Sequence, residues 1–385
     1  MLHSPLGRSG RVLAVRTAVN PQTIHGSDVM SRIQCAIEGR QADLTDEIRR
    51  AVGALCSRLM ASAKLDGTAG LDSVVIVGNS VMHHLFCAID LAPLSRAPFE
   101  PVDKGPHRFR ADDLGWTLGG DPIVRFLPCL GGFVGSDILC GVLATKMHLS
   151  TTAIVLVDLG TNGEIVVGHR ERMLCASTAA GPAFEGGRIS KGMRATTGAI
   201  SEVAAEGGRL HCRVIGNVAP RGICGSGLVD AVAAGLDLGL IEKGGRLANG
   251  GHPLELGPHV TLTQNDIRQL QLAKAAIAAG IRLLRQRFGR EACDPVPIYL
   301  AGAFGNYVNR TSARRIGLID APEDTIEPAG NTALLGAKMA LFANDPDADA
   351  FRDLRSRIEH LPLAADPAFH QTYVEELGFP ASVRS

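Results

Sequence analysis

Residues 154–168 have the sequence Ile-Val-Leu-Val-Asp-Leu-Gly-Thr-Asn-Gly-Glu-Ile-Val-Val-Gly. Two apolar runs flank a short polar turn, which predicts two antiparallel strands joined at Asn162-Gly163. Asp158 stands where the first strand stops. A strand-end carboxylate beside small residues is suited to hold Mg²⁺ while backbone N–H groups approach an anion. The spacing alone leaves a purely structural turn open beside a phosphate-binding one.

Composition excludes several classes of protein. The chain has 385 residues, 45% of them hydrophobic and 20% charged, so it can bury a sizeable core in two or three domains. Its 39 basic and 39 acidic side chains give zero net charge, which argues against nucleic acid as a partner. Apolar runs stay below the ~20 residues that span a bilayer, and residues 1–8 do not resemble a secretory signal. We therefore expect a cytoplasmic protein without a membrane partner.

The cysteines follow no metal-binding spacing. No two form a CxxC pair, their number is odd, and most stand in apolar segments, which predicts buried reduced thiols. A metal cluster held within this chain is not expected from the spacing. The nine are Cys35, Cys56, Cys87, Cys129, Cys140, Cys175, Cys212, Cys224 and Cys293.

Strands that run through glycine turns into helices recur along the chain. The apolar run at 73–77 predicts a buried parallel strand, and the turn at 78–80 leads into a helix that carries His83 and His84. We expect one of these histidines in the core and the other facing a cleft or solvent, with a structural role favoured over a ligand role. A strand at 11–19, a helix that Ser27-Asp28 opens, and a helix at 44–63 capped by Thr45 are also expected. Thr263 and Asp266 stand at capping-box spacing, which predicts a long helix from there to about residue 288.

Motifs in four parts of the chain resemble the actin, sugar kinase and heat-shock chaperone ATPase superfamily. Residues 158–164 are similar to its second phosphate motif and residues 300–306 to its adenosine motif. Residues 131–143 and 330–340 are similar to its two connecting helices, whose small residues let them cross closely. The resemblance implies an α/β, two-lobed actin-like (ASKHA) ATPase fold with a cleft between a first lobe at 1–150 and a second at 151–385.

Nine motifs in order narrow the resemblance to the reductive activators of corrinoid proteins, from about Val12 to Pro380. Such enzymes use ATP to return an inactive Co(II) corrinoid protein to Co(I) for methyl transfer. The motifs are Asn20–Gln22, Asp28–Ile33, Val77–His84, Leu127–Gly132, Asp158–Glu164, Ser177–Gly186, Gly222–Gly227, Gln271–Lys274 and Ala301–Tyr307.

Two features of that family are not found in this sequence. Members carry an N-terminal [2Fe-2S] ferredoxin-like domain and open their ATPase region with an Asp-Ile-Gly-Thr-Thr hairpin, the first phosphate motif. Here residues 11–19 correspond to what would be the third strand. We therefore expect either a truncated chain or one that works with a separate electron donor and an incomplete nucleotide site. The first lobe is then expected to expose a sheet edge on which a partner strand can pair.

The resemblance also implies ATP and Mg²⁺ as cofactors and assigns residues to them. Asp158 would hold Mg²⁺, directly or through water, and either Asp137 or Glu185 would orient the attacking water. For these last two, a buried hydrogen-bonded carboxylate remains an open alternative. Phosphate contacts fall to Gly160, Thr161, Asn162 and Gly163, and the adenosine pocket to Gly302, Ala303, Gly305 and Asn306 with Gly225, Ser226 and Gly227.

The resemblance implies a corrinoid protein and a separate electron donor as partners. It leaves open whether the chain forms a homodimer. Nucleotide binding and hydrolysis would drive a two-state closure that the partner senses. A non-catalytic ATP-binding or docking module is the alternative that an incomplete phosphate site favours. A small-molecule kinase is less favoured, because nothing in the sequence marks a sugar or acetate pocket.

Overall fold

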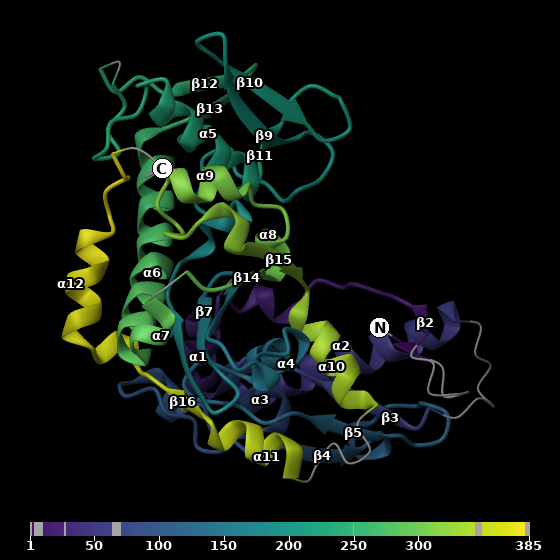
Figure 1. Ribbon diagram of the computed structural model, residues 1–385. Helices are drawn as coiled ribbons and strands as arrows, with labels where there is room; N and C mark the ends of the chain where they lie inside the picture. Colours follow the sequence, from purple (N-terminus) through teal and green to yellow (C-terminus); the bar gives the residue numbers. More distant parts are fainter. Residues whose placement is uncertain are drawn as a thin grey trace. The chain divides into compact units, whose positions relative to one another are not determined.

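The computed structural model describes residues 2–3, 11–26, 28–63, 71–248, 250–293, 295–342 and 349–381 (Figure 1). It divides into two compact units: unit 1 holds residues 1–148 and 332–362, and unit 2 holds residues 149–331 and 363–385. The sequence-based division near residue 150 stays a prediction. Ser27, expected at the start of a helix, lies outside the described residues. Within the described ranges, no helix combines the length and apolarity needed to cross a membrane.

Unit 1 is built on a three-stranded mixed sheet in the order β3-β5-β4. The apolar run predicted as a parallel strand forms β3 (Ser73–Ile76), which pairs in parallel with β5 (Ile123–Phe126). Its residues are half-buried instead of fully buried, because β3 is an edge strand of this sheet. The remaining elements are β1 (Leu2–His3), β2 (Val12–Ala14), α1 (Val29–Cys35), α2 (Gln41–Ser62), α3 (Ser80–Cys87), β4 (His107–Arg110), α4 (Ser136–Ala144), α10 (Thr332–Leu341), α11 (Asp349–Ser356) and β16 (Ile358–His360).

Two predictions for the start of unit 1 are wrong. The strand expected over 11–19 is limited to β2, at Val12–Ala14. The cap assigned to Thr45 does not exist, because α2 already begins at Gln41, directly after a kink that separates it from α1. Gly39 makes this possible with a φ of 96°. Thr45 instead lies buried inside α2, where its hydroxyl donates to the carbonyl oxygen of Leu85 at 2.7 Å.

The helices α4 and α10 pack with very close backbones, as their small residues predict. A Cβ atom at Gly336 of α10 would lie 2.1 Å from the carbonyl oxygen of Cys140 in α4. At the start of α4, a Cβ atom at Gly135 would lie 2.0 Å from the carbonyl oxygen of Gly78. These glycines therefore hold α4 against both α10 and the turn between β3 and α3.

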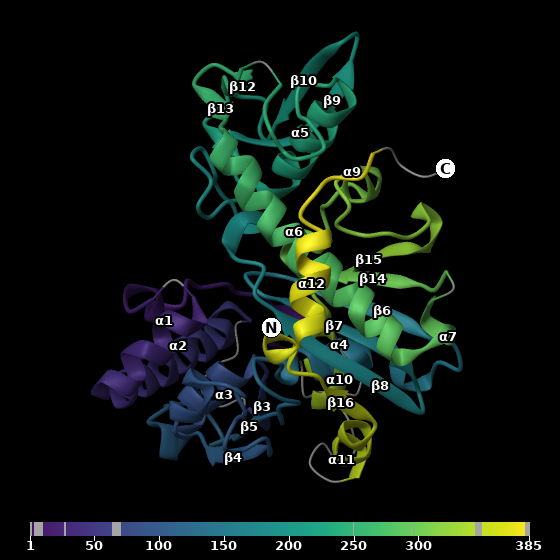
Figure 2. The same ribbon diagram turned by 90° about the vertical axis from the view of Figure 1, so that its left-hand side faces the viewer.

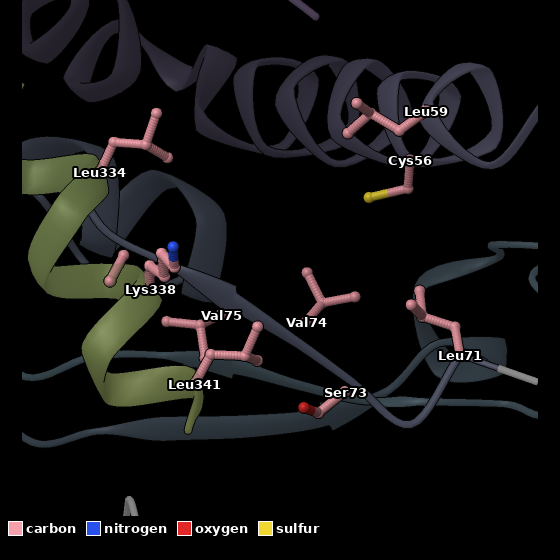
Figure 3. Close-up of a pocket in the computed structure, with 10 residues that line it drawn as sticks. Cys56, Leu59, Leu71, Ser73, Val74, Val75, Leu334, Lys338 and Leu341 are labelled. Carbon is pink, nitrogen blue, oxygen red and sulfur yellow. The ribbon is translucent and has the colours of Figure 1, made fainter. Parts of the chain in front are cut away.

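An apolar groove lies beside β3 (Figure 3). Its lining includes Leu59 of α2, Val74 of β3, and Leu334 and Leu341 of α10. Among the described residues, β3 pairs with β5 alone, so its other edge is open next to this groove. That a partner strand pairs with an exposed edge of the first lobe stays a prediction.

Unit 2 is built on a mixed sheet whose strands follow the order β15-β14-β6-β7-β8. The predicted hairpin supplies β6 (Ile154–Leu159) and β7 (Gly163–His169), and β8 (Arg172–Thr178) continues it. On the other side of β6, β14 (Ile298–Ala301) pairs in parallel with both β6 and β15 (Ile326–Gly330). The α/β fold class predicted from the sequence is confirmed.

The long helix α6 (Gln264–Phe288) supports this sheet. It begins with the predicted capping box, in which Thr263 and Asp266 exchange hydrogen bonds. Figures 1 and 2 both show α12 (Pro367–Glu375) alongside α6. The other elements of unit 2 are β9 (Ala199–Glu206), β10 (Arg209–Val214), β11 (Gly222–Ile223), α5 (Gly225–Asp237), β12 (Leu254–Gly257), β13 (Val260–Leu262), α7 (Arg290–Cys293), α8 (Gly302–Gly305) and α9 (Arg310–Arg315).

Candidate nucleotide-binding site

The hairpin turn occupies residues 160–162, one residue earlier than predicted. Gly163 is already the first residue of β7, where it pairs with Leu159. A Cβ atom at Gly163 would lie 2.7 Å from Cγ1 of Ile277 in α6. The glycine therefore lets α6 pack closely on the hairpin, and the turn that remains for an anion consists of Gly160, Thr161 and Asn162.

Asp158 and the start of α8 meet at one edge of the sheet. The parallel register pairs Ala301 of β14 with Asp158 of β6, so both strands end at the same edge. Gly302 follows with a φ of 85°, and a Cβ atom there would lie 2.6 Å from Oδ1 of Asp158. The structure thus brings together the residues predicted to hold Mg²⁺ and to line the adenosine pocket. Carboxyl ends of parallel strands are the usual place for ligands in α/β folds.

The Asp158 carboxylate lacks a counter-charge. It makes no hydrogen bond or ion pair with any residue that the structure describes, and burial raises its pKa to about 6. A carboxylate that is desolvated without a cationic partner is electrostatically costly, and a bound cation removes that cost. Carboxylate oxygen is also a preferred ligand of Mg²⁺. The residues present therefore fit Mg²⁺ at Asp158, directly or through its waters.

The hairpin turn is tied to the small-residue loop that follows β8. The hydroxyl of Thr161 donates to Oε1 of Glu185 at 2.7 Å, and the amide of Gly181 donates to the carbonyl oxygen of Thr161 at 2.8 Å. Glu185 is exposed, so the alternative of a buried carboxylate does not describe it. Its contact with Thr161 places it beside the predicted phosphate turn.

Two phenylalanines that the sequence analysis did not single out join the remaining motifs. The rings of Phe184 and Phe304 stack with centroids 4.6 Å apart. A Cβ atom at Gly225 would lie 1.9 Å from the carbonyl oxygen of Phe184 and 3.1 Å from Cδ2 of Phe304. This cluster brings the first turn of α5 against α8. The signal was present in the sequence, because each phenylalanine stands inside a glycine-rich motif of a chain with few aromatic residues.

The other residues at the start of α5 serve packing in this structure. Ser226 is buried, and its hydroxyl donates to the carbonyl oxygen of Ser201 at 2.9 Å. A Cβ atom at Gly227 would lie 2.3 Å from the carbonyl oxygen of Ile200 in β9. Both residues thus fix α5 against β9, and their contact with a nucleotide stays a prediction.

The remaining predicted site residues are divided between α8 and its end in unit 2 and α4 in unit 1. Gly305 and Ala303 lie in α8, where Gly305 packs on Leu300, and Asn306 follows as an exposed residue. Asp137 belongs to unit 1, whereas the others belong to unit 2. It stands in the first turn of α4, where Oδ1 accepts a hydrogen bond from the amide of Ile138 at 2.9 Å.

Comparison with known families agrees with this geometry. The family model described as the C-terminal domain of RACo, the ASKHA domain, matches residues 152–384, and the one described as the RACo middle region matches residues 7–150. The chain belongs to the RACo family. The resemblance stated from the sequence, including the ASKHA fold, is therefore confirmed.

Relatives of this RACo-family chain carry related names. It is 36% identical to the corrinoid activation enzyme RamQ of Eubacterium limosum, over 97% of this chain and 68% of RamQ. It is 32% identical to the [Co(II) methylated amine-specific corrinoid protein] reductase of Methanosarcina barkeri, over 66% of this chain and 51% of the reductase. The solved reductive activator for corrinoid, iron-sulfur protein superposes with a TM-score of 0.84 at 30% identity, covering 97% of this chain and 63% of that structure.

Proposed function

We propose that this RACo-family chain is an ATP-dependent activator that reduces a corrinoid protein from Co(II) to Co(I). The names of both curated relatives point to corrinoid activation or reduction. The chain spans 68% of RamQ, 51% of the reductase and 63% of the solved activator, so the activity of the whole protein is part of this proposal. In this proposal a separate low-potential donor supplies the electron.

The observation that carries the nucleotide part of the proposal is the close approach of the Gly302 backbone to the Asp158 carboxylate. The ionised Asp158 would hold Mg²⁺ or its waters, and the amides of Thr161 and Asn162 would be the phosphate donors of the turn. The amide of Gly160 donates to the carbonyl oxygen of Asn162 at 3.0 Å, within the turn itself. The backbone at 302–305 would line the adenosine pocket, and the Asp158 carboxylate leaves no room for a side chain on Gly302. Bound Mg·ATP supplies the free energy of binding and hydrolysis that the uphill reduction requires.

Glu185 is the residue in unit 2 that is best placed to act on water near the phosphates. Its carboxylate is exposed and accepts the hydrogen bond of Thr161 in the phosphate turn. With ATP bound, Glu185 would be the group that orients a water or accepts its proton beside the phosphate turn. Asp137 keeps the same role as an alternative within the proposal.

The test measures three quantities on the full chain. Calorimetry gives ATP binding with Mg²⁺, phosphate release gives turnover, and absorbance gives the appearance of Co(I) in an added corrinoid protein under a chemical reductant. The proposal expects phosphate release that the corrinoid protein stimulates, together with ATP-dependent Co(I). Binding without turnover in the presence of the partner would indicate a docking module, and phosphate transfer to a small molecule would indicate a kinase; either result rejects the proposal.

A further inference from the structure

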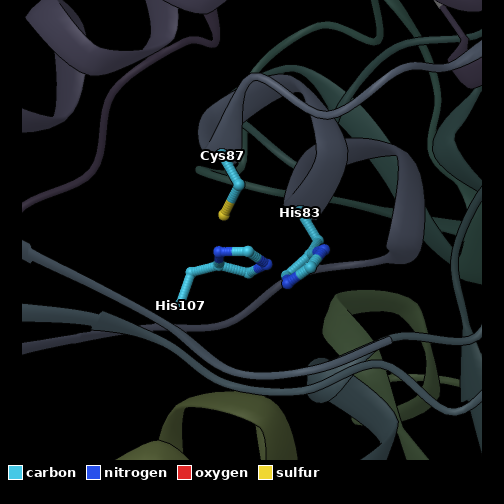
Figure 4. A group of neighbouring side chains, drawn as sticks. All are labelled: His83, Cys87 and His107. Carbon is cyan, nitrogen blue, oxygen red and sulfur yellow. The ribbon is translucent and has the colours of Figure 1, made fainter. Parts of the chain in front are cut away.

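Two histidines and a cysteine converge in unit 1, in a group that the proposed function does not use. His83 and Cys87 stand one turn apart on α3, and His107 is the first residue of β4 (Figure 4). One ligand atom from each lies within 4.8 Å of the others. The β4–β5 register places His107 opposite Phe126, whose ring packs edge-on against His83 with centroids 5.1 Å apart. The topology of unit 1 therefore fixes this group.

Each histidine has one ring nitrogen held by an oxygen acceptor. Nε2 of His83 lies 3.0 Å from the carbonyl oxygen of Gly105, and Nε2 of His107 lies 3.0 Å from Oδ2 of Asp103. A carbonyl or carboxylate oxygen accepts, so in each neutral ring Nε2 carries the proton and the lone pair resides on Nδ1. Nδ1 of His83 lies 3.3 Å from Nδ1 of His84, so a cation bound at His83 replaces that contact. Histidines that bind metals in proteins almost always show this second interaction, which sets the tautomer and orients the ring.

One loop supplies both of these acceptors. Asp103 accepts a hydrogen bond from the amide of Gly105 at 2.6 Å through Oδ1, while its Oδ2 contacts His107. The carbonyl of the same Gly105 contacts His83. The loop between residues 103 and 107 thus orients both rings at once, which makes Asp103 a positioning residue for the group.

We propose that His83, Cys87 and His107 bind one divalent cation of the zinc class. Two imidazoles and one thiolate form a borderline-soft ligand set, which suits Zn²⁺ and Co²⁺ and does not suit Mg²⁺ or Ca²⁺. Tetrahedral coordination at the usual bond lengths brings ligand atoms to about 3.5 Å from one another, so small side-chain movements complete the site. Three protein ligands leave the fourth position to water.

His83 already has the protonation that such a cation needs, and the cysteine acquires it on binding. His83 is fully buried, and that burial lowers its pKa to about 4, so its ring is neutral near pH 7. Burial raises the pKa of the Cys87 thiol to about 12. A coordinated thiol is deprotonated outright, so binding releases one proton from Cys87. The cation then links α3 to β4 through side chains that are otherwise joined by packing alone.

The test titrates Co²⁺ into the full chain after metal removal, without nucleotide or corrinoid protein. We expect one equivalent to bind with tetrahedral d–d absorption and a thiolate-to-cobalt charge-transfer band, and Zn²⁺ to displace it. Cys87→Ser should remove the charge-transfer band. The matched control is Cys56→Ser, because Cys56 is another half-buried cysteine of unit 1 with a raised pKa. That variant should keep the band unchanged.

Two further variants keep the test decisive if Cys87→Ser does not fold. His107→Gln, at a half-buried strand position, should weaken Co²⁺ binding at least tenfold. Asp103→Asn should weaken it about 10–100-fold, because the carboxylate orients His107 without binding the metal itself. A metal-free chain that binds neither Co²⁺ nor Zn²⁺, or a charge-transfer band that persists in Cys87→Ser, overturns the site. Because ATP and the corrinoid protein are absent, failure here leaves the proposed activity untouched.

Discussion

A Cβ atom on Gly302 would lie 2.6 Å from Oδ1 of Asp158 and 2.8 Å from the carbonyl oxygen of Leu159. The backbone that begins α8 therefore lies against the carboxylate that we assign to Mg²⁺. Gly302→Ala should displace either the α8 turn or Asp158, and it also places a side chain at a φ of 85°. We expect Mg·ATP affinity to fall at least tenfold, measured by calorimetry.

Gly208→Ala is the matched control for the backbone strain that Gly302→Ala introduces. Gly208 has a φ of 76°, and a Cβ atom there meets no heavy atom within 4 Å. This variant should lose about 1 kcal/mol of stability, as a left-handed alanine does, and keep its ATP affinity. Equal affinity losses in the two variants would show that strain alone, and not the contact with Asp158, explains the effect.

The titration of Asp158 predicts a pH dependence. Burial raises its folded-state pKa to about 6, above the ordinary 3.8, so the ionised form that binds Mg²⁺ is lost as the pH falls through 6. Mg²⁺-dependent ATP affinity should then drop by about tenfold per pH unit below 6. Without ligand the sign is opposite: this group adds stability as the pH falls from about 6 toward 4.

Asp158→Asn is the variant that isolates both effects. It should lose Mg²⁺-dependent ATP binding at pH 7 and show no further loss between pH 7 and pH 5. Its gain in free energy of unfolding over wild type should be largest above pH 6, where the wild-type carboxylate is buried in its ionised form. An unchanged affinity at pH 7 contradicts the assignment of Asp158 to the metal.

The contact between α4 and α10 makes Gly336 sensitive to substitution. In Gly336→Ala the new methyl group would lie 2.1 Å from the carbonyl oxygen of Cys140, so the two helices must separate. We expect a loss of about 1–3 kcal/mol in the free energy of unfolding, measured with urea. Leu335→Ala, at an exposed position of the same helix, should change it by less than about 0.5 kcal/mol.

Lys274 anchors the C-terminal segment of unit 2. It is 1% exposed on α6, and its ammonium donates to the carbonyl oxygen of Gly378 at 2.6 Å. Lys274→Met leaves that carbonyl without its donor, so the segment should open more often. Hydrogen exchange at the amide of Phe379, which bonds to the carbonyl oxygen of Lys243 at 2.8 Å, should accelerate at least tenfold. Leu272→Ala, half-exposed on the same helix, should leave it unchanged.

Local patterns predicted the elements that carry strong sequence signals. Residues near one another in the chain predict the hairpin at 154–168, the capping box at Thr263 and the close helix packing at Gly336. The predicted cap at Thr45 failed because α2 begins at Gln41, just after the kink at Gly39, and apolar spacing does not reveal that start. The helix on which Thr45 stands therefore begins earlier than its apolar pattern indicates.

Features that depend on distant residues escaped the sequence. The expectation that one of His83 and His84 faces a cleft or solvent is wrong, since both are 0% exposed. Cysteine spacing gave no sign of the proposed metal site, because two of its three ligands are histidines. One of these, His107, stands on a strand 24 residues after His83. The stacking of Phe184 on Phe304 likewise joins loops that only the fold of unit 2 brings together.

The most direct test follows Co(I) formation in a corrinoid protein by absorbance, with the full chain, Mg·ATP and a low-potential reductant. The account predicts Co(I) formation that requires both the chain and ATP, that is lost in Asp158→Ala, and that is kept in Gly208→Ala. Co(I) that forms equally without ATP, or equally with Asp158→Ala, would contradict it.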